Sequence, residues 1–164
     1  MRTILILVNG AKIAAVASTA RQRKQWAEHA RAELRLAGHR SGGARTAVID
    51  QMTGQDCCLT AQEIFDLLRA DGRDAGIASV YRALELLTRM GLVRRVEVGE
   101  AAGYEPELPS GDHHHHVVCD RCGRVGSFED EALERAIDRL ARRLDFDVGR
   151  HDVVLRGACE DCRR

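Results

Sequence analysis

Two Cys-x-x-Cys motifs constrain this chain more than any other feature: Cys119 with Cys122, and Cys159 with Cys162. Two residues between cysteines let one turn bring both sulfur atoms to the same ion. Two such turns complete a closed tetrahedral shell of thiolates, which predicts a zinc site. A closed shell leaves no position for a substrate, so this zinc is expected to be structural. Disulfides or redox thiols are the alternative, although nothing else in the sequence indicates a disulfide-rich secreted scaffold.

The residues around the two motifs predict a small domain. We expect strands at 115–119, 125–128 and 153–156, with a helix that begins after Asp130. The apolar residues of this helix form one stripe: Leu133, Ala136, Ile137, Leu140, Ala141 and Leu144. The four cysteines would join the two ends of this α/β domain.

A run of four histidines precedes the first motif. Side chains alternate along an extended chain, so His113 and His115 face one way and His114 and His116 face the other. One run can therefore supply ligands to two separate metal sites. Each site needs further ligands, and the candidates are Glu134 and His151 on the C-terminal side, and Cys58, Glu105 and Glu107 on the N-terminal side.

The N-terminal half predicts a winged helix-turn-helix. Apolar spacing indicates helices at about 21–37 and 45–52, and Thr60 with Glu63 fits a capping box at the start of a third. A fourth helix is expected from a cap at Ser79 to about Met90. The valines of 93–98 and the later Tyr104 then suggest a β-hairpin.

The fourth helix has two distinct faces. Its apolar residues fall on one side, whereas Tyr81, Arg82 and Arg89 fall on the other. Arginines can reach phosphates or guanine edges, and a tyrosine ring can touch thymine methyl groups, which favours a recognition helix. An ordinary solvent-facing helix is the alternative.

Charge is unevenly distributed although the net charge is zero. Residues 1–100 carry 15 Lys and Arg against 11 Asp and Glu, whereas residues 101–164 carry 10 against 14. This split suits a DNA-binding part joined to a ligand-binding part, although solvated charged helices would give the same balance.

These patterns divide the chain into residues 1–20, an N-terminal extension; 21–105, a winged-helix DNA-binding domain; 106–112, a hinge; and 113–164, a metal-binding domain. The apolar run Ile4–Val8 admits a secretion signal as an alternative, but Asn9, Gly10 and Lys12 interrupt it. No later segment is long enough to span a membrane. We expect a cytoplasmic protein without a membrane partner.

Several motifs together resemble the ferric uptake regulator (Fur) family. HHHHVVCDRCGRV and the closing CEDC are similar to its dimerisation domain, and TAQEIFDLL with the later VYR is similar to its winged helix. The likeness covers roughly residues 26–162. It implies an α+β fold in which a winged helix-turn-helix precedes a small α/β dimerisation domain. It also implies a homodimeric, metal-dependent repressor that binds double-stranded palindromic operators and is not an enzyme.

The resemblance also assigns residues to sites. It implies structural zinc at Cys119, Cys122, Cys159 and Cys162; a second metal site at His113, His115, Glu134 and His151; a regulatory hinge site at Cys58, His114, His116 and either Glu105 or Glu107; and DNA contacts at Tyr81, Arg82 and Arg45. Cys58 departs from the family, which usually has His there. Glu105 follows the aromatic Tyr104 as the family pattern prefers, whereas Glu107 better keeps the spacing to His116.

The ligand types bear on the regulatory metal. His115 stands where iron-sensing members typically have Asp, and Cys58 adds a thiolate. Softer ligands favour Zn²⁺ over Fe²⁺ or Mn²⁺, so the sequence predicts a zinc sensor. An iron- or peroxide-sensing regulator is the close alternative. A metal-dependent hydrolase, for which no HExxH motif is present, and a zinc-bound interaction protein are weaker ones.

Overall fold

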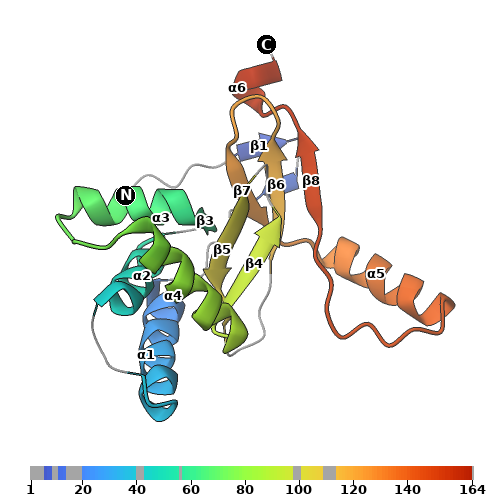
Figure 1. Cartoon of the computed structure of the whole chain (residues 1–164). Coiled ribbons are helices and arrows are strands. Elements are labelled where there is room, and N and C mark those ends of the chain that lie inside the picture. Colours follow the sequence, from blue (N-terminus) through green and yellow to red (C-terminus); the bar gives the residue numbers. More distant parts are fainter. Residues whose placement is uncertain are drawn as a thin grey trace. The chain divides into compact units, whose positions relative to one another are not determined.

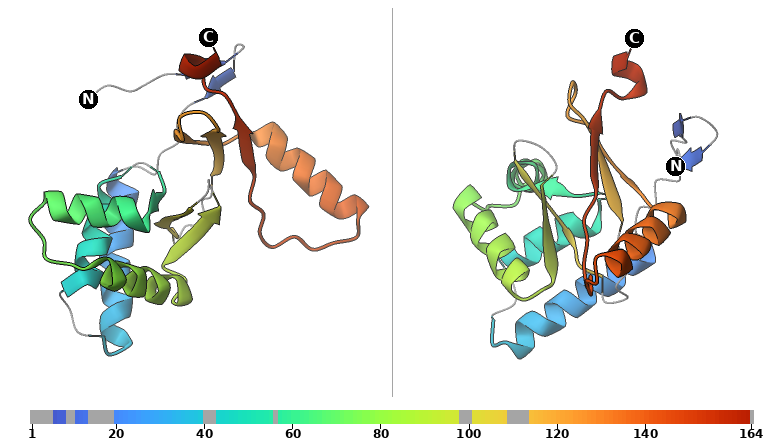
Figure 2. Two further views of the ribbon diagram at one scale, coloured as in Figure 1. Left: turned by 45° about the horizontal axis from the view of Figure 1, so that its top comes forward. Right: turned by 90° about the vertical axis from the view of Figure 1, so that its right-hand side faces the viewer.

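The computed structural model describes residues 6–8, 11–13, 20–39, 43–55, 57–97, 101–108 and 114–163. The chain divides into two compact units. One is formed by residues 17–112, and the other by residues 113–164 together with residues 1–16. Figures 1 and 2 show the helices and strands of each unit.

Helices dominate the unit of residues 17–112. They are α1 (Ala20–Leu36), α2 (Gly43–Thr53), α3 (Ala61–Ala70) and α4 (Ile77–Arg89), all near their predicted positions. An antiparallel sheet follows, with the order β3 (Leu59–Thr60), β5 (Ala102–Pro106) and β4 (Val93–Glu97). Helices followed by a hairpin confirm the predicted winged helix-turn-helix.

The core of this unit comes from the apolar faces of all four helices. Trp26 of α1 is fully buried, and its indole Nε1 donates a hydrogen bond to the Leu92 carbonyl at 2.7 Å. Aliphatic residues of the other helices surround it, chiefly Val48, Ile49, Ile64, Leu68, Val80, Leu84 and Leu87. Burying these side chains fixes α4 against α2 and α3, and leaves the polar face of α4 outside.

The helix starts are partly as predicted. Thr60 and Glu63 form the expected capping box, in which each side chain bonds the other's backbone amide. Ser79 does not cap α4, so that prediction is wrong. The helix begins three residues earlier, after an extended Gly76, and the Ser79 hydroxyl accepts a hydrogen bond from Arg82 at 3.1 Å.

The second unit is built on β6 (His115–Cys119), which lies between antiparallel β7 (Val125–Phe128) and parallel β8 (Val154–Gly157). Helix α5 (Glu131–Arg143) connects β7 to β8, and Asp130 caps it as predicted by accepting from the Leu133 amide. A short helix α6 (Glu160–Arg163) ends the described chain. Strands β1 (Ile6–Val8) and β2 (Ala11–Ile13) pair with each other.

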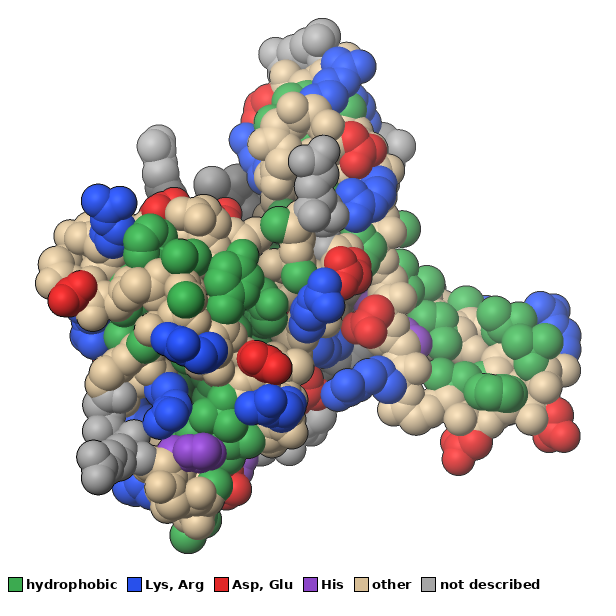
Figure 3. Space-filling model, viewed as in Figure 1, with side chains coloured by type: hydrophobic (Ala, Val, Ile, Leu, Met, Phe, Trp, Pro, Cys, Tyr) green, Lys and Arg blue, Asp and Glu red, His purple; other side chains and the backbone are tan. Residues whose placement is uncertain are grey.

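Helix α5 keeps its apolar stripe uncovered. No residue of α5 is buried in the described part of the chain; Leu140 is 44% exposed and Leu144, its C-cap, is 63% exposed. Figure 1 shows α5 extending away from strands β6, β7 and β8 of the same unit, and Figure 3 shows hydrophobic side chains gathered along it. A stripe of this kind is a candidate surface for contact with another chain.

Among the described helices, none combines the length and the apolar character needed to cross a membrane.

Candidate metal centres and DNA-facing helix

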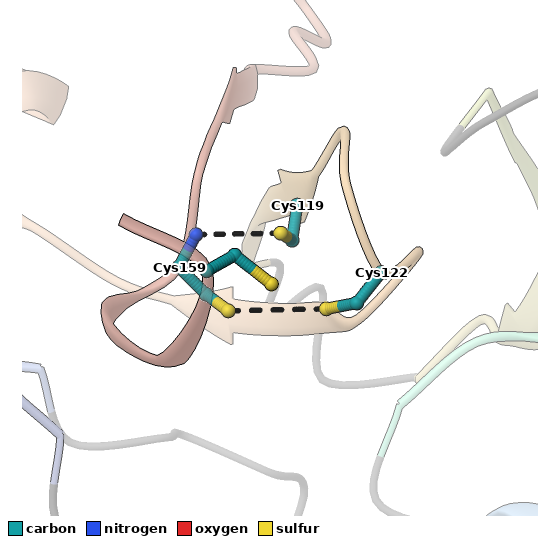
Figure 4. A group of neighbouring side chains, drawn as sticks. Cys119, Cys122 and Cys159 are labelled. Atoms are coloured by element: carbon teal, nitrogen blue, oxygen red, sulfur yellow. Dashed lines mark hydrogen bonds between the residues drawn. The ribbon is translucent and has the colours of Figure 1, made fainter. Parts of the chain in front are cut away.

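The four cysteines meet at one end of the β6 sheet. Cys119 ends β6, Cys122 follows in the turn, and Cys159 and Cys162 come directly after β8. Strands β6 and β8 are parallel neighbours, with Cys119 opposite Gly157. The cysteines at the ends of both strands therefore lie at the same end of the sheet. All four sulfur atoms lie within 4.8 Å of one another, and Figure 4 shows three of these side chains pointing together.

The spacing of these sulfurs fits zinc. The Sγ atoms of Cys122 and Cys159 are 3.8 Å apart. Two thiolates on a tetrahedral zinc with Zn–S bonds of about 2.3 Å are separated by about 3.8 Å. The donor set therefore matches the closed thiolate shell that the sequence predicts.

Backbone hydrogen bonds favour the thiolate form of Cys119. The Cys159 amide donates to the Cys119 sulfur at 3.3 Å. Together with the amides of Cys122 and Arg121, it lowers the pKa of Cys119 to about 6. Hydrogen bonding with the side chains of Cys159 and Cys122 raises the pKa of Cys162 to about 12. Binding of a metal ion would release the protons that the other cysteines of the cluster still carry.

A second cluster lies between β6 and α5. His115 is buried on β6, and its Nε2 is 2.7 Å from Oε1 of Glu134 on α5. The other oxygen of Glu134 is 3.1 Å from Nε2 of His151, which precedes β8. One carboxylate thus lies between two imidazoles, in a group whose ligand atoms lie within 4.8 Å of one another. His113, the fourth predicted member, lies outside the described residues.

The other two histidines form a pair of their own. The rings of His114 and His116 lie edge to face, with centroids 5.0 Å apart. Neighbouring residues of β6 point to opposite faces of the sheet, so this pair lies away from the His115 cluster. His116 is buried and His114 is half-buried. These two residues can offer ring nitrogens to one ion.

Two adjacent thiols lie just before β3. The Cys57 and Cys58 sulfurs are 3.8 Å apart and both side chains are half-buried. The hydrogen bond with Cys57, then burial, then the negative charges of Cys57, Glu105 and Glu63 raise the pKa of the Cys58 thiol. The family resemblance assigns only Cys58 to the hinge site. The one sequence feature that points to Cys57 is its position next to Cys58.

The two candidate carboxylates differ in their surroundings. Glu105 on β5 lies directly opposite Arg94 on β4, whose Nε donates to Glu105 Oε1 at 2.8 Å. Glu105 is only 2% exposed and the Arg94 side chain 10%. Glu107 is half-buried, and its nearest oxygen lies 4.0 Å from the same Nε. Sequence reasoning missed Arg94, because its role depends on the register of the hairpin.

Helix α4 carries the predicted DNA-reading residues on its outer face. Tyr81 is 53% exposed, and Arg82 and Arg89 are also exposed. A surface pocket brings Arg82 and Arg89 together with Arg45 of α2, and also with His39 and Ser79; Tyr81 lies outside its lining. The pocket forms a largely basic surface with one acid, Glu85, which pairs with Arg89 at 3.4 Å.

Known proteins with a similar sequence are regulators. The chain is 31% identical to the ferric uptake regulation protein of Neisseria meningitidis over 135 residues, which cover 80% of this chain and 92% of the relative. It is 30% identical to the peroxide-responsive repressor PerR of Staphylococcus aureus over 138 residues, which cover 83% and 90%.

Solved structures with a similar fold include the Helicobacter pylori ferric uptake regulator, with a TM-score of 0.76 at 22% identity over 90% of this chain and 96% of that one. A zinc uptake regulator complexed with zinc and DNA matches with a TM-score of 0.56 at 27% identity, over 86% and 95%. The family model of the ferric uptake regulators matches residues 36–156. The chain therefore belongs to the ferric uptake regulator family.

Proposed function

We propose that this protein is a metal-responsive transcriptional repressor that binds palindromic operators as a metal-loaded homodimer, with zinc as its regulatory metal. One observation carries the proposal: a winged helix with exposed Tyr81, Arg82 and Arg89 precedes a domain in which three types of metal ligand cluster. Family membership supports the same reading. The named relatives are a regulation protein and a repressor, which favours regulation over the hydrolase alternative.

DNA contact is assigned to α4 and to its basic surroundings. An α-helix fits the major groove, where arginine can pair with guanine and tyrosine can contact thymine. Arg45 on α2 lines the same pocket as Arg82 and Arg89, so it is placed to contact a phosphate beside the groove. The zinc uptake regulator of similar fold was solved with DNA, which supports this use of the fold.

A second copy of the chain is the proposed partner of α5. The stripe containing Leu140 and Leu144 is uncovered in the described chain, and burying it against its own equivalent would remove apolar surface from water. Symmetric dimers use the same patch on both subunits. Two winged helices, in residues 21–105, would then be joined through domains formed by residues 113–164.

The regulatory ion would couple the two domains across the hinge at 106–112. Cys58 and one of Glu105 and Glu107 belong to the DNA-binding side, and His114 and His116 belong to the dimer side. An ion bound by both sides would restrict the angle between the two winged helices, and so would select the arrangement that fits two half-sites. The four-cysteine site supplies stability, and His113, His115, Glu134 and His151 form the second site.

The types of ligand favour a zinc sensor, whereas the named relatives favour an iron or peroxide sensor. Thiolate and imidazole groups are softer than carboxylates and suit zinc. The relatives at 31% and 30% identity are a ferric uptake regulation protein and a peroxide-responsive repressor. An iron- or peroxide-sensing regulator is therefore the second candidate.

Selection from a random duplex DNA library tests the proposal without a known operator. Purified protein that retains its structural zinc would be loaded with Zn²⁺, Fe²⁺ or Mn²⁺ before each round. We expect zinc to enrich a palindromic sequence most strongly. Enrichment with iron or manganese but not with zinc would favour the second candidate. Equal enrichment in the presence of each metal and in its absence would contradict a metal-responsive regulator.

A further inference from the structure

Cys57 and Cys58 form a pair of thiols, of which the family likeness assigns only Cys58 to a site. Their sulfurs are 3.8 Å apart, and both lie in the unit of residues 17–112. The Leu59 backbone that follows pairs with Tyr104 in the sheet, and Thr60 caps α3. The pair is therefore attached to a segment that is fixed on its C-terminal side.

The separation of these two sulfurs suits one tetrahedral ion. Thiolates bound to the same zinc lie about 3.8 Å apart. The Cys122 and Cys159 sulfurs of the four-cysteine cluster also lie 3.8 Å apart. Cys57 and Cys58 can thus bind one ion with little rearrangement of their sulfurs.

One oxygen of the Glu105 carboxylate is already paired with Arg94. It is buried opposite Arg94 and accepts the Arg94 Nε at 2.8 Å. Moving this oxygen, Oε1, onto a metal ion would leave the guanidinium of Arg94, itself 10% exposed, without its closest acceptor. Breaking a buried ion pair in this way is strongly unfavourable. Glu107, at 4.0 Å from the same guanidinium, does not replace that close contact.

We infer that Cys57 and Cys58 both bind the regulatory ion, while Glu105 remains paired with Arg94. The inference rests on the proposed function and deepens it, since it adds a second thiolate to the ligands of the regulatory ion. A divalent ion and two thiols then give a bis-thiolate complex and two released protons. Two thiolates make the site soft, which selects zinc over iron and manganese.

Cobalt substitution counts these thiolates. Protein that retains its structural zinc, checked by elemental analysis, would be titrated with Co²⁺. Thiolate-to-cobalt charge transfer in the near ultraviolet would then report only on the added ion, since the His115 cluster offers no sulfur. We expect Cys57→Ser and Cys58→Ser each to lose about half of this absorption, because each removes one of two thiolate ligands. Gln62→Ala, at an exposed position on α3, should keep all of it.

X-ray absorption at the cobalt edge of the wild-type protein gives a second readout that does not depend on variants folding. A total of two sulfur neighbours per chain, summed over all the added cobalt, supports the inference, whereas a total of one or none overturns it. An unchanged charge-transfer band in Cys57→Ser also overturns it, while metal-dependent DNA binding would leave the proposed function standing. A wild-type protein that binds no ion beyond its structural zinc and ignores metal in DNA binding would overturn both.

Discussion

His115 on β6 and Glu134 on α5 lie 2.7 Å apart, from Nε2 to Oε1, although 19 positions separate them in the sequence. Glu134 also reaches His151 at 3.1 Å. This candidate metal cluster therefore connects the central strand of its sheet to the helix that carries the uncovered apolar stripe. Binding at this cluster would hold α5 in place for the proposed dimer.

Glu134→Ala should remove the second bound ion, because it deletes the carboxylate that lies between two imidazoles. We expect the metal content of fully loaded protein to fall by about one ion per chain, since a site that loses a protein ligand binds weakly. Elemental analysis after gel filtration measures this. Glu131→Ala, on an exposed acid of the same helix, is the control and should bind the full complement. Equal metal content in both variants would show that the cluster holds no ion.

Cys159→Ser should destabilise the unit that contains β6. A structural zinc site contributes folding free energy directly, and an incomplete shell loses much of it. Thermal unfolding followed by circular dichroism should shift to lower temperature, and the protein should lose zinc to a mild chelator. Cys57→Ser, a thiol outside the cluster, should keep the wild-type zinc content under that chelator. If Cys159→Ser retained zinc and melted as the wild type does, the four cysteines would not form a structural site.

Leu140→Glu should favour the monomer, because it places a charge within the apolar stripe of α5. Burying a charge without a partner in a subunit contact is costly. Sedimentation equilibrium should show a weaker self-association than in the wild type, by at least tenfold in the dissociation constant for a penalty of about 1.4 kcal/mol or more. Asp138→Lys, on the opposite side of the helix, should dimerise normally. A Leu140→Glu protein that dimerises as well as the wild type would mean that another surface is used.

Arg82→Ala should weaken DNA binding. Losing one well-formed arginine contact costs about 1–3 kcal/mol, or roughly 5- to 150-fold in affinity. Fluorescence anisotropy with the selected duplex measures the change. Arg135→Ala removes an exposed arginine from α5 and should change affinity little, since its pair with Glu131 is solvent-exposed. Equal affinities for Arg82→Ala and the wild type would remove α4 from the DNA interface.

Local sequence signals predicted the regular elements well. Thr60 and Asp130 cap helices as expected, because capping depends on residues a few positions away. Strands β6 and β7 begin and end where predicted, because turn residues and the first cysteine motif bound them. Ser79 misled the prediction, because serine is a common cap but the chain turns helical already after Gly76. The two-residue strand β3 is too short to carry a periodic signal.

The candidate sites were harder to predict wherever they depend on pairing between strands. Glu105 looks like an available carboxylate in the sequence, and only the hairpin register shows that it faces Arg94. The distance between the Cys57 and Cys58 sulfurs likewise depends on side-chain rotamers that a sequence does not specify. The proximity of Glu134 to His115 and His151 depends on where the first turn of α5 lies relative to β6, which helical periodicity alone cannot give.

Metal-dependent affinity for the selected duplex tests the central claim most directly. Fluorescence anisotropy would compare protein that holds only its structural zinc with the same protein after adding a further equivalent of zinc. A coupling free energy of about 1–3 kcal/mol predicts a 5- to 150-fold gain in affinity on adding zinc. Removing the added zinc with a mild chelator should reverse the gain. The same affinity with and without the added zinc, iron or manganese would contradict the account.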